Sequence, residues 1–487
     1  MGATSGIQKK KPKNLSREAQ LSSKLTSFSK SKDLRSALSL YDVALADNTS
    51  FNQQHLNSLL YICSASLDSS AKALAIDYGY EIFKRMVSSG VKPNEACVTA
   101  MVRIASARPD GDYAFELVRR MKDWGLIPRL RTCSPVLLCF CEELEAEKAY
   151  EVEEHVNDAG VNLEEVELAA LLRVSSETGR PAKVYEYLQK LRAAVGCVRE
   201  ETSKIIADWF ERFDANGHIL EENVVKEALS RNGGGWHGLG WLGQGRWTIQ
   251  GDEIEEHGDC LSCGERLVGV DIDNTETERF AASVASLAME REVVSNFSEF
   301  QSWLDEHGDF EAIVDGANVG LYQQNFAKGG FSVSQLDAVV KELHEQRKKK
   351  PLIILHNKRV RALYEDAKTR VVVDEWIKNG FLHATPPGSN DDWYWLYAAI
   401  RLKCYLVTND EMRDHIFELL NPSFFLKWKD RHQVRYTFAK GSLTLHMPPP
   451  YSSVIQESEL GSWHVPFKRT DGAKSWLCIT RHRTLGT

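Results

Sequence analysis

The sequence predicts a multidomain α + α/β protein with three parts: an α-helical repeat solenoid, a small β-rich platform that binds a metal, and a Rossmann-like α/β domain. Three observations lead to this prediction. A glycine recurs at a fixed period between helical patterns, a CxxC motif lies among short glycine-rich and tryptophan-rich strands, and strands alternate with helices in the last third of the chain. With 487 residues, the chain is also too long for one hydrophobic core.

The composition excludes several classes of protein. Hydrophobic residues make up 43% of the chain, which is ordinary for a soluble protein. No apolar run approaches the roughly 18–20 residues of a membrane span, so we expect no membrane partner. The formal net charge is −8, so a nucleic-acid partner would need a local basic surface. Ten cysteines without a secretory signal pattern indicate a reducing compartment, where close cysteine pairs favour metal over disulfide.

Residues 1–29 are rich in serine and lysine, and we expect a disordered basic tail there. The run "KKKPK" at 9–13 is typical of a nuclear import signal, although a solvated tail explains it equally well. An organellar presequence should be rich in arginine, and Arg17 is the only arginine before residue 35. We therefore expect a nuclear protein, with the mitochondrion or chloroplast as the alternative.

A helical repeat fills the region that follows. Gly90, Gly125 and Gly160 are 35 residues apart, and Gly196 comes one residue late. A helical pattern precedes each glycine and a second amphipathic segment follows it, which indicates two-helix units that end at a C-cap glycine. Earlier units are expected over 51–94 and near 32–45. The predicted solenoid covers residues 30–225.

The period and the junction "G-[VIL]-x-P" resemble the pentatricopeptide repeat, a family that binds RNA along one face of its solenoid. The resemblance implies two base-facing positions per repeat, which by motif match are Asn57 with Asn94, Thr99 with Arg129, and Ser134 with Glu164. Only the first pair resembles a usual base-reading pair, so we do not expect a long single strand to be read. A solenoid that binds protein instead of RNA is the alternative.

A metal clip is expected on the central platform. "CLSC" places Cys260 and Cys263 in a CxxC motif, and its flanks lack the βαβ pattern of a redox site. A tetrahedral zinc needs two further ligands, and the tryptophan-flanked strands near the C-terminus offer His464 and Cys478. The alternative is a buried Cys478 and a surface His464 without a metal. The platform would then be built from residues 226–280 and 442–487.

Four aspartates are predicted to meet at one edge of a parallel sheet over residues 281–441. Strands are expected at 311–319, 351–357, 380–386 and 404–410, with helical patterns at 332–349, 360–379 and 391–403. Asp315 and Asp410 end the first and fourth strands, and Asp391 and Asp392 start the helix after the third. Ligands bind beyond the carboxyl ends of such strands. We therefore expect the first strand to deliver Asp315 to the surface.

Converging carboxylates repel one another unless a cation neutralises them, and hard divalent cations prefer oxygen ligands. One or two Mg²⁺ (or Mn²⁺) ions would suit hydrolysis of a phosphodiester bond. An N-cap role explains one of Asp391 and Asp392, not all four acids. Candidate phosphate contacts nearby are Asn318, Lys358, Arg359 and Arg413, for which a turn residue and solvated cations are the alternatives.

The motifs "DGAN", "SNDDW" and "TND" resemble the PIN-like nucleases of the NYN group. The order of repeats, split metal platform and nuclease resembles the plant-type protein-only ribonuclease P family over almost the whole chain after residue 30. That resemblance implies removal of the 5′ leader of precursor tRNA without an RNA subunit. It implies catalytic metal at Asp315, Asp391, Asp392 and Asp410, and one structural Zn²⁺ at Cys260, Cys263, His464 and Cys478.

Further expectations follow from the same resemblance. Because the platform uses chain on both sides of the nuclease, we expect it to join the two other domains as a hinge. We also expect a monomer. Two other functions remain open: a general single-strand endoribonuclease, and a noncatalytic RNA-binding solenoid with an inactive nuclease domain.

Overall fold

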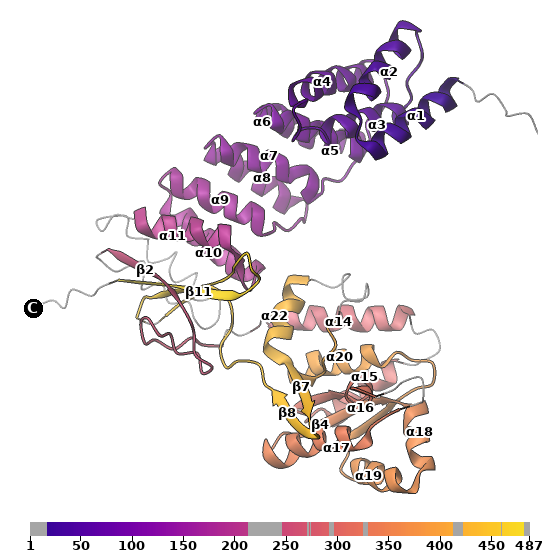
Figure 1. Ribbon diagram of the computed structural model, residues 1–487, viewed down its shortest axis with the longest axis vertical. Helices are drawn as coiled ribbons and strands as arrows, with labels where there is room; N and C mark the ends of the chain where they lie inside the picture. Colours follow the sequence, from indigo (N-terminus) through magenta and orange to yellow (C-terminus); the bar gives the residue numbers. More distant parts are fainter. Residues whose placement is uncertain are drawn as a thin grey trace, which may run out of the picture. The chain divides into compact units, whose positions relative to one another are not determined.

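The computed structural model describes residues 17–212, 246–269, 272, 274–291, 297–324, 330–412, 422–458 and 460–481 (Figure 1). The chain divides into two compact units, Met1–Leu188 and Gln189–Thr487, and each is described by itself. Among the described helices, none is both long enough and apolar enough to cross a membrane.

The first unit is a stack of antiparallel helix pairs. Its helices are α1 (Arg17–Ser31), α2 (Leu34–Ala46), α3 (Gln53–Ser64), α4 (Lys72–Ser88), α5 (Glu95–Ala107), α6 (Gly111–Arg119), the 3₁₀ helix η1 (Arg120–Trp124), α7 (Leu130–Glu142), α8 (Ala146–Asp158) and α9 (Glu165–Glu177), followed by α10 (Pro181–Ala194) across the boundary. The first helices of successive pairs pack on one another, α3 on α5, α5 on α7 and α7 on α9. The predicted helical repeat is confirmed.

The period of 35 residues has its physical basis in the helix ends. Gly90, Gly125 and Gly160 have φ angles of 75°, 70° and 68°, a left-handed conformation that favours glycine. At each of these helix ends, a backbone hydrogen bond joins the residue after the glycine to the carbonyl five residues earlier. One example is the bond from the N–H of Val161 to the carbonyl of Val156 at 3.1 Å. This is the Schellman arrangement, which satisfies carbonyls that the helix leaves open. The predicted C-cap glycines are confirmed at these three positions.

Part of the expected disordered tail is helical, which corrects the prediction for residues 17–29. Helix α1 is polar overall, but Leu21 and Leu25 lie one turn apart and are 5% and 1% exposed. They face α3, against which α1 packs, and the hydroxyl of Ser22 lies 2.7 Å from His55 Nε2. Two buried leucines and one partly buried polar contact add this helix to the stack, although they leave only a weak pattern in the sequence.

The central platform is a five-stranded sheet that draws on chain from both sides of the α/β domain. Its strands are β1 (Val198–Arg199), β2 (Trp247–Asp252), β9 (Gln456–Glu457), β10 (Trp463–Lys468) and β11 (Lys474–Arg481). The order is β1-β10-β11-β2, with β9 beside β10, and only the β1–β10 pair is parallel. Helix α11 (Glu200–Arg212) packs on β2, β10 and β11.

Residues 198–212, which the sequence analysis placed in the solenoid, contact the platform sheet. The reason is the apolar face of α11, whose buried residues include Ile206, Trp209 and Phe210. The ring of Phe210 lies 4.8 Å from Trp247 of β2 and 5.6 Å from Trp463 of β10. An amphipathic helix at the end of a repeat array buries its face on the surface it meets, here an aromatic sheet.

The α/β domain contains a six-stranded sheet covered on both faces (Figure 1). Its strands are β3 (Ala312–Asp315), β4 (Pro351–His356), β5 (Leu382–Thr385), β6 (Tyr405–Val407), β7 (Gln433–Ala439) and β8 (Ser442–His446), in the order β5-β4-β3-β6-β7-β8. Neighbours are parallel except β7 and β8. The helices are α14 (Asn274–Arg291), α15 (Phe297–His307), α16 (Gly316–Leu321), α17 (Val333–Lys341), the π-helix η3 (Glu342–Gln346), α18 (Asn357–Glu365), α19 (Ala367–Lys378), α20 (Asp391–Leu402) and α22 (Pro422–His432).

One apolar core lies on each face of this sheet. The first joins α14, α15, α20 and α22 to the strands, and the second joins α17 and α19 to them. Helix α14 starts before the expected boundary at residue 281 and β8 ends after 441. The helix expected over 360–379 is two helices, because the Asp366 carboxylate accepts the N–H of Lys368 and starts α19.

The helix ends yield a test of the repeat geometry. Gly160→Ala should lower the free energy of unfolding by about 1 kcal/mol, because an L residue is strained at a φ of 68°. No atom lies within 4 Å of the added Cβ, so the cost is conformational and not steric. Chemical denaturation measures it. Gly160→Asn is the control, since asparagine tolerates this conformation, and an equal loss in both variants would contradict the explanation.

Candidate active site and metal centre

Asp315 lies at the end of β3, the strand between β4 and β6. Contrary to the expectation that it reaches the surface, it is only 4% exposed. Its carboxylate accepts the backbone N–H of Asn318 and the hydroxyl of Thr408, each at 2.9 Å. Burial raises the pKa of Asp315 to about 7, and these two bonds oppose the shift. The strand thus carries a buried acid to the carboxyl edge and holds it rigidly.

Thr408 couples the ends of two neighbouring strands. Strand β6 ends at Val407, so residues 408–410, which we call the TND loop, follow it instead of continuing it as the sequence predicted. The backbone N–H of Asp410 donates to the Thr408 hydroxyl oxygen at 3.1 Å. That oxygen is then an acceptor, and its own hydrogen is free to point at Asp315. One side chain therefore links Asp315 to the backbone that carries Asp410.

Asp391 and Asp392 begin α20, the helix that packs against β3, β4 and β6. Neither is the N-cap, because Asn390 takes that position and accepts the N–H of Asp392 at 3.2 Å. Burial raises the pKa of Asp392 to about 6, and the charges of Asp391 and Asp410 add to the shift. The charges of Asp392 and Asp391 also raise the pKa of Asp315. The structure thus brings all four predicted aspartates into one electrostatically coupled group.

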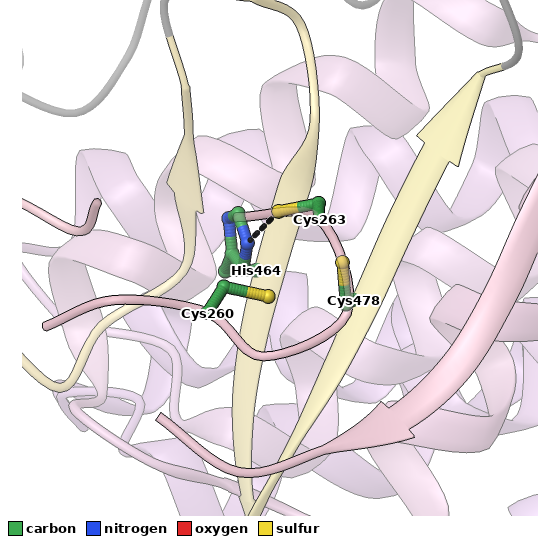
Figure 2. A group of neighbouring side chains, drawn as sticks. All are labelled: Cys260, Cys263, His464 and Cys478. Atoms are coloured by element: carbon green, nitrogen blue, oxygen red, sulfur yellow. Dashed lines mark hydrogen bonds between the residues drawn. The ribbon is translucent and has the colours of Figure 1, made fainter. Parts of the chain in front are cut away.

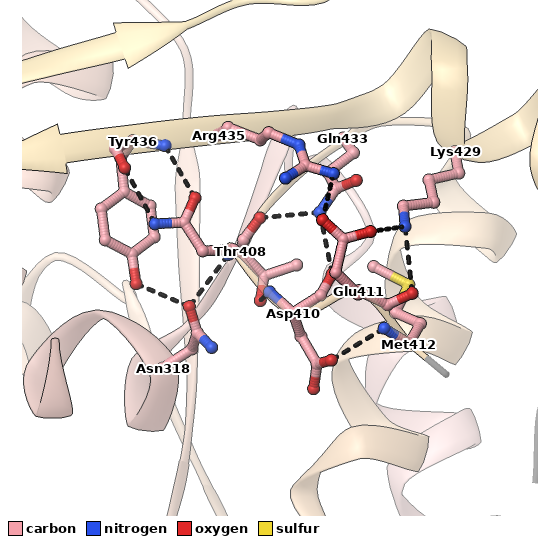
Figure 3. Close-up of polar contacts among 10 residues, drawn as sticks. Asn318, Thr408, Asp410, Glu411, Met412, Lys429, Gln433, Arg435 and Tyr436 are labelled. Atoms are coloured by element: carbon pink, nitrogen blue, oxygen red, sulfur yellow. Dashed lines mark hydrogen bonds and ion pairs between the residues drawn. The ribbon is translucent and has the colours of Figure 1, made fainter. Parts of the chain in front are cut away.

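Strand β7 holds the TND loop in place, and sequence reasoning missed it. The Gln433 side-chain N–H donates to the carbonyls of Thr408 and Asp410 at 2.9 and 3.0 Å (Figure 3). The Asp410 carboxylate accepts the N–H of Met412 at 2.7 Å. The alternation of Val434, Tyr436 and Phe438 with more polar residues was the signal that could have revealed this strand.

The other predicted phosphate contacts lie at different places on this edge. The Asn318 side-chain oxygen accepts two hydrogen bonds, from Tyr436 and from the backbone of Asn409. Lys358 and Arg359 belong to α18, which follows β4 at the same end of the sheet. Lys358 is exposed, and Arg359 lies over the ring of Phe331 at 5.2 Å. Arg413 lies outside the described residues.

The predicted base-facing residues of the solenoid separate into two groups. Most make contacts within the helical stack: Asn94 caps α5 through the N–H of Cys97, Asn57 accepts the Cys97 thiol at 3.4 Å, Thr99 is bonded to Thr132 at 2.7 Å, and the hydroxyl of Ser134 donates to Glu167. Arg129 and Glu164 are exposed at the helix starts.

The four predicted metal ligands of the platform meet in space (Figure 2). His464 and Cys478 are paired across the antiparallel strands β10 and β11, so their side chains share one face of the sheet. The loop with Cys260 and Cys263 approaches that face, and Cys263 Sγ lies 3.3 Å from His464 Nε2. All four ligand atoms lie within 4.8 Å of one another, the only such group of three or more potential ligands among the described residues.

The thiols and the imidazole of this centre are donors that suit a cation. Hydrogen bonds from Cys260 and Cys478 lower the pKa of Cys263, and the bonds to Cys260 and Cys263 raise the pKa of Cys478. One thiolate is thus stabilised by protons on its neighbours, and three thiolates together would repel. His464 is fully buried and directs Nε2 at the thiols. Three sulfurs and one imidazole in this spacing fit a tetrahedral metal.

Two family models match the chain. The pentacotripeptide-repeat region of PRORP matches residues 8–216, and protein-only RNase P matches residues 254–478. Proteinaceous RNase P 3 of Arabidopsis thaliana is 58% identical to this chain over 494 residues, which cover 97% of this chain and 86% of the relative. The chain belongs to the protein-only RNase P family.

Other members of the protein-only RNase P family are similar over the same length. Proteinaceous RNase P 1 of A. thaliana, described as chloroplastic/mitochondrial, is 47% identical over 98% of this chain and 85% of its own. The crystal structure of nuclear proteinaceous RNase P 2 from A. thaliana has a TM-score of 0.81 at 57% identity and covers 96% of this chain and 100% of that one. The predicted combination of helical repeats with an α/β domain is therefore confirmed.

The crowded carboxylates have a consequence for stability without metal. In EDTA, the free energy of unfolding should fall as pH rises from about 4 to about 7. Folded Asp392 and Asp315, with pKa values of about 6 and 7, keep protons that the unfolded chain has already lost. Asp392→Asn should therefore stabilise the protein by about 2 kcal/mol at pH 8 and hardly at pH 4. Denaturation curves at the two pH values measure this difference.

Glu306→Gln, which removes an exposed charge on α15, is the control and should leave the pH dependence unchanged. A pH-independent effect of Asp392→Asn would show that the buried charge does not destabilise the folded state.

Proposed function

We propose that this chain removes the 5′ leader of precursor tRNA by hydrolysing one phosphodiester bond, without an RNA subunit. The mature tRNA would then carry a 5′ phosphate, and the leader a 3′ hydroxyl. The observation that carries the proposal is the coupled group of four aspartates at the carboxyl edge of the sheet, in a chain that belongs to the protein-only RNase P family. Hydrolysis of a phosphodiester is the chemistry that such a group suits.

The active-site cation is proposed to be Mg²⁺ or Mn²⁺, held by Asp315, Asp391, Asp392 and Asp410. The donor set is all oxygen, and burial together with mutual repulsion raises the pKa of two members, so a hard cation fits it. Magnesium usually keeps several waters, so an edge lined with acids suits it better than a closed cage. When bound, it would neutralise charge on the phosphate and lower the pKa of the attacking water.

The remaining residues of this edge would bind and orient the substrate. Lys358 and Arg359, at the start of α18, are proposed to contact phosphates that flank the cleaved bond, and Arg413, outside the described residues, stays a predicted third contact. Thr408 would hold the buried carboxylate of Asp315 in one orientation. Rigid placement of these groups contributes to catalysis because the reacting atoms need not be reorganised.

The solenoid is proposed to bind the folded body of the tRNA at its elbow. Asn94, Thr99 and Ser134 make contacts inside the stack, whereas Arg129 is exposed. Asn57 is half-buried and can still present its amide nitrogen. A folded tRNA shows few unstacked bases, so shape and backbone charge should dominate the contact. This proposal needs no run of base-reading pairs.

We further propose that the platform metal is one structural Zn²⁺, because sulfur and imidazole donors at four positions favour it. A monomer in the nucleus is proposed as well. The basic run at 9–13 supports nuclear import, with an organelle as the alternative.

The function is tested with a precursor tRNA and Mg²⁺. The wild-type chain should cut once, at the junction of leader and mature tRNA. Asp391→Ala or Asp392→Ala should slow the cut by about 100-fold or more while precursor binding stays nearly intact. Mapping the cut end identifies the cleaved bond, and filter retention measures precursor binding by the wild type and the variants. A general endoribonuclease would cut an unstructured RNA of the same leader sequence equally well, and a noncatalytic RNA-binding protein would cut neither.

The zinc is tested by metal analysis of the purified protein. One zinc per chain is expected, and Cys260→Ala or Cys478→Ala should lower the zinc content and the melting temperature together. A structural zinc contributes on the order of 10 kcal/mol in small domains. The aromatic packing of Trp247 and Trp463 on α11 should offset part of the loss. Cys404→Ala, a buried thiol of the α/β domain, is the control and should keep the zinc. Wild-type protein without zinc would refute the assignment.

A further inference from the structure

Tyr436 and Asn318 are 118 residues apart in sequence and meet at the acidic edge (Figure 3). The Tyr436 hydroxyl donates to the Asn318 side-chain oxygen at 2.6 Å. The backbone N–H of Asn409 donates to the same oxygen at 2.9 Å. Asn318 also lies next to two of the acids. Its backbone N–H donates to the Asp315 carboxylate, and Asn409, which donates to its side chain, directly precedes Asp410 in the sequence. The side chain of Asn318 thus lies between the ends of β3 and β6.

These two bonds determine which way the Asn318 amide faces. A backbone N–H can only donate, so the atom opposite Asn409 must be the amide oxygen and not the nitrogen. That oxygen has two lone pairs, and the two donors occupy both. It is therefore not available as a metal ligand. The side-chain nitrogen points away from both donors in Figure 3, and no hydrogen-bond acceptor contacts it among the described residues.

Tyr436 is itself held firmly enough to impose this orientation. The residue is 1% exposed, and its ring packs edge-on against Tyr322 with centroids 5.2 Å apart. Its backbone N–H donates to the Asn409 side-chain oxygen at 3.1 Å, and its carbonyl accepts the Asn409 side-chain nitrogen at 2.8 Å. The Asn409 amide thus continues the β6–β7 pairing past the end of β6. The hydroxyl of Tyr436 has little freedom to move.

We propose that Tyr436 is a positioning residue for RNA cleavage, which acts by turning the amide hydrogens of Asn318 toward a nonbridging oxygen of the scissile phosphate. The inference rests on the proposed function. A neutral N–H donor suits this place, because it can bind phosphate without competing with a cation for the carboxylates. Asn409 assists through its backbone N–H, and Tyr436 never contacts the substrate.

The test measures single-turnover cleavage of a precursor tRNA with saturating enzyme, using phosphate or either phosphorothioate diastereomer at the scissile position. Asn318→Ala should slow cleavage of the phosphate substrate by about 100-fold. Tyr436→Phe should slow it by about 3- to 10-fold, the contribution of one hydrogen bond, with unchanged precursor binding. The double variant should be no slower than Asn318→Ala, because both changes act through one group.

The phosphorothioates separate positioning from a merely structural role. Sulfur is a weaker hydrogen-bond acceptor, so the ratio of phosphate to phosphorothioate rates should exceed one in the wild type for one diastereomer. That ratio should fall in Tyr436→Phe and fall further in Asn318→Ala. Tyr322→Phe is the matched control: it removes a hydroxyl from the neighbouring ring without touching Asn318, and its rate and ratio should equal those of the wild type.

Three outcomes would overturn the inference: a wild-type rate for Tyr436→Phe, a slower rate with an unchanged phosphorothioate ratio, or the same loss in Tyr322→Phe. If Tyr436→Phe melts at a lower temperature than Tyr322→Phe, Asn318→Asp decides instead. It keeps an oxygen for both donors and lacks the amide hydrogens, so its phosphorothioate ratio must fall. The position at which the wild-type protein cuts the precursor is measured independently of the ratios among variants. Failure to cut at the leader junction would refute the proposed function, whereas the ratios among variants can be measured on any RNA that the wild type cuts.

Discussion

The burial and mutual repulsion of carboxylates that share the edge of one parallel sheet are the constraint on which the site of the α/β domain depends. Asp315 is buried at the end of β3, and the charges of Asp391 and Asp392 act on it. Two hydrogen-bond donors stabilise the Asp315 carboxylate, the backbone N–H of Asn318 and the hydroxyl of Thr408. The N-terminus of α20, with its partial positive charge, carries the two helix acids. Because Asn390 serves as the N-cap, neither of these acids caps the helix.

The platform solves a similar problem with thiols. The ligand atoms of three cysteines and a histidine lie within 4.8 Å of one another. Without a metal, hydrogen bonds from the neighbouring thiols stabilise the thiolate of Cys263. The geometry comes from two simple elements, the cross-strand pair of His464 and Cys478 and a CxxC loop. Gly264, with a φ of 72°, closes that loop as its N–H donates to the carbonyl of Cys260 at 2.9 Å. Both sites therefore bring together potential metal ligands that would repel one another if all were ionised.

The sequence predicted those parts of the fold and the sites that local patterns encode. The apolar strand that ends in Asp315 and the CxxC motif follow from spacing within a few residues, and the repeat follows from glycines that recur every 35 residues. It did not predict Gln433 or Tyr436, because their roles depend on β6 and β7 pairing side by side, a long-range contact with no local signature. Helix α1 was missed for the opposite reason. Its local pattern is mostly polar, and two leucines that meet α3 stabilise it. The burial of Asp315 also depends on its neighbours, not on its own segment.

In the solenoid, side chains at predicted base-facing positions make contacts between repeats. The hydroxyls of Thr99 and Thr132 bond across successive repeats at 2.7 Å, and Ser134 bonds to Glu167 in the next one. Glu95 forms an ion pair with Arg131 in the same manner. Side chains that would contact bases in a base-reading repeat here join one repeat to the next. Each such contact joins two repeats and occupies a donor or acceptor that a base would otherwise need. A stiff stack that offers few base contacts is suited to a ligand of fixed shape, since binding then costs little ordering of the protein. A rigid folded RNA meets that condition, whereas a flexible single strand would still have to be ordered.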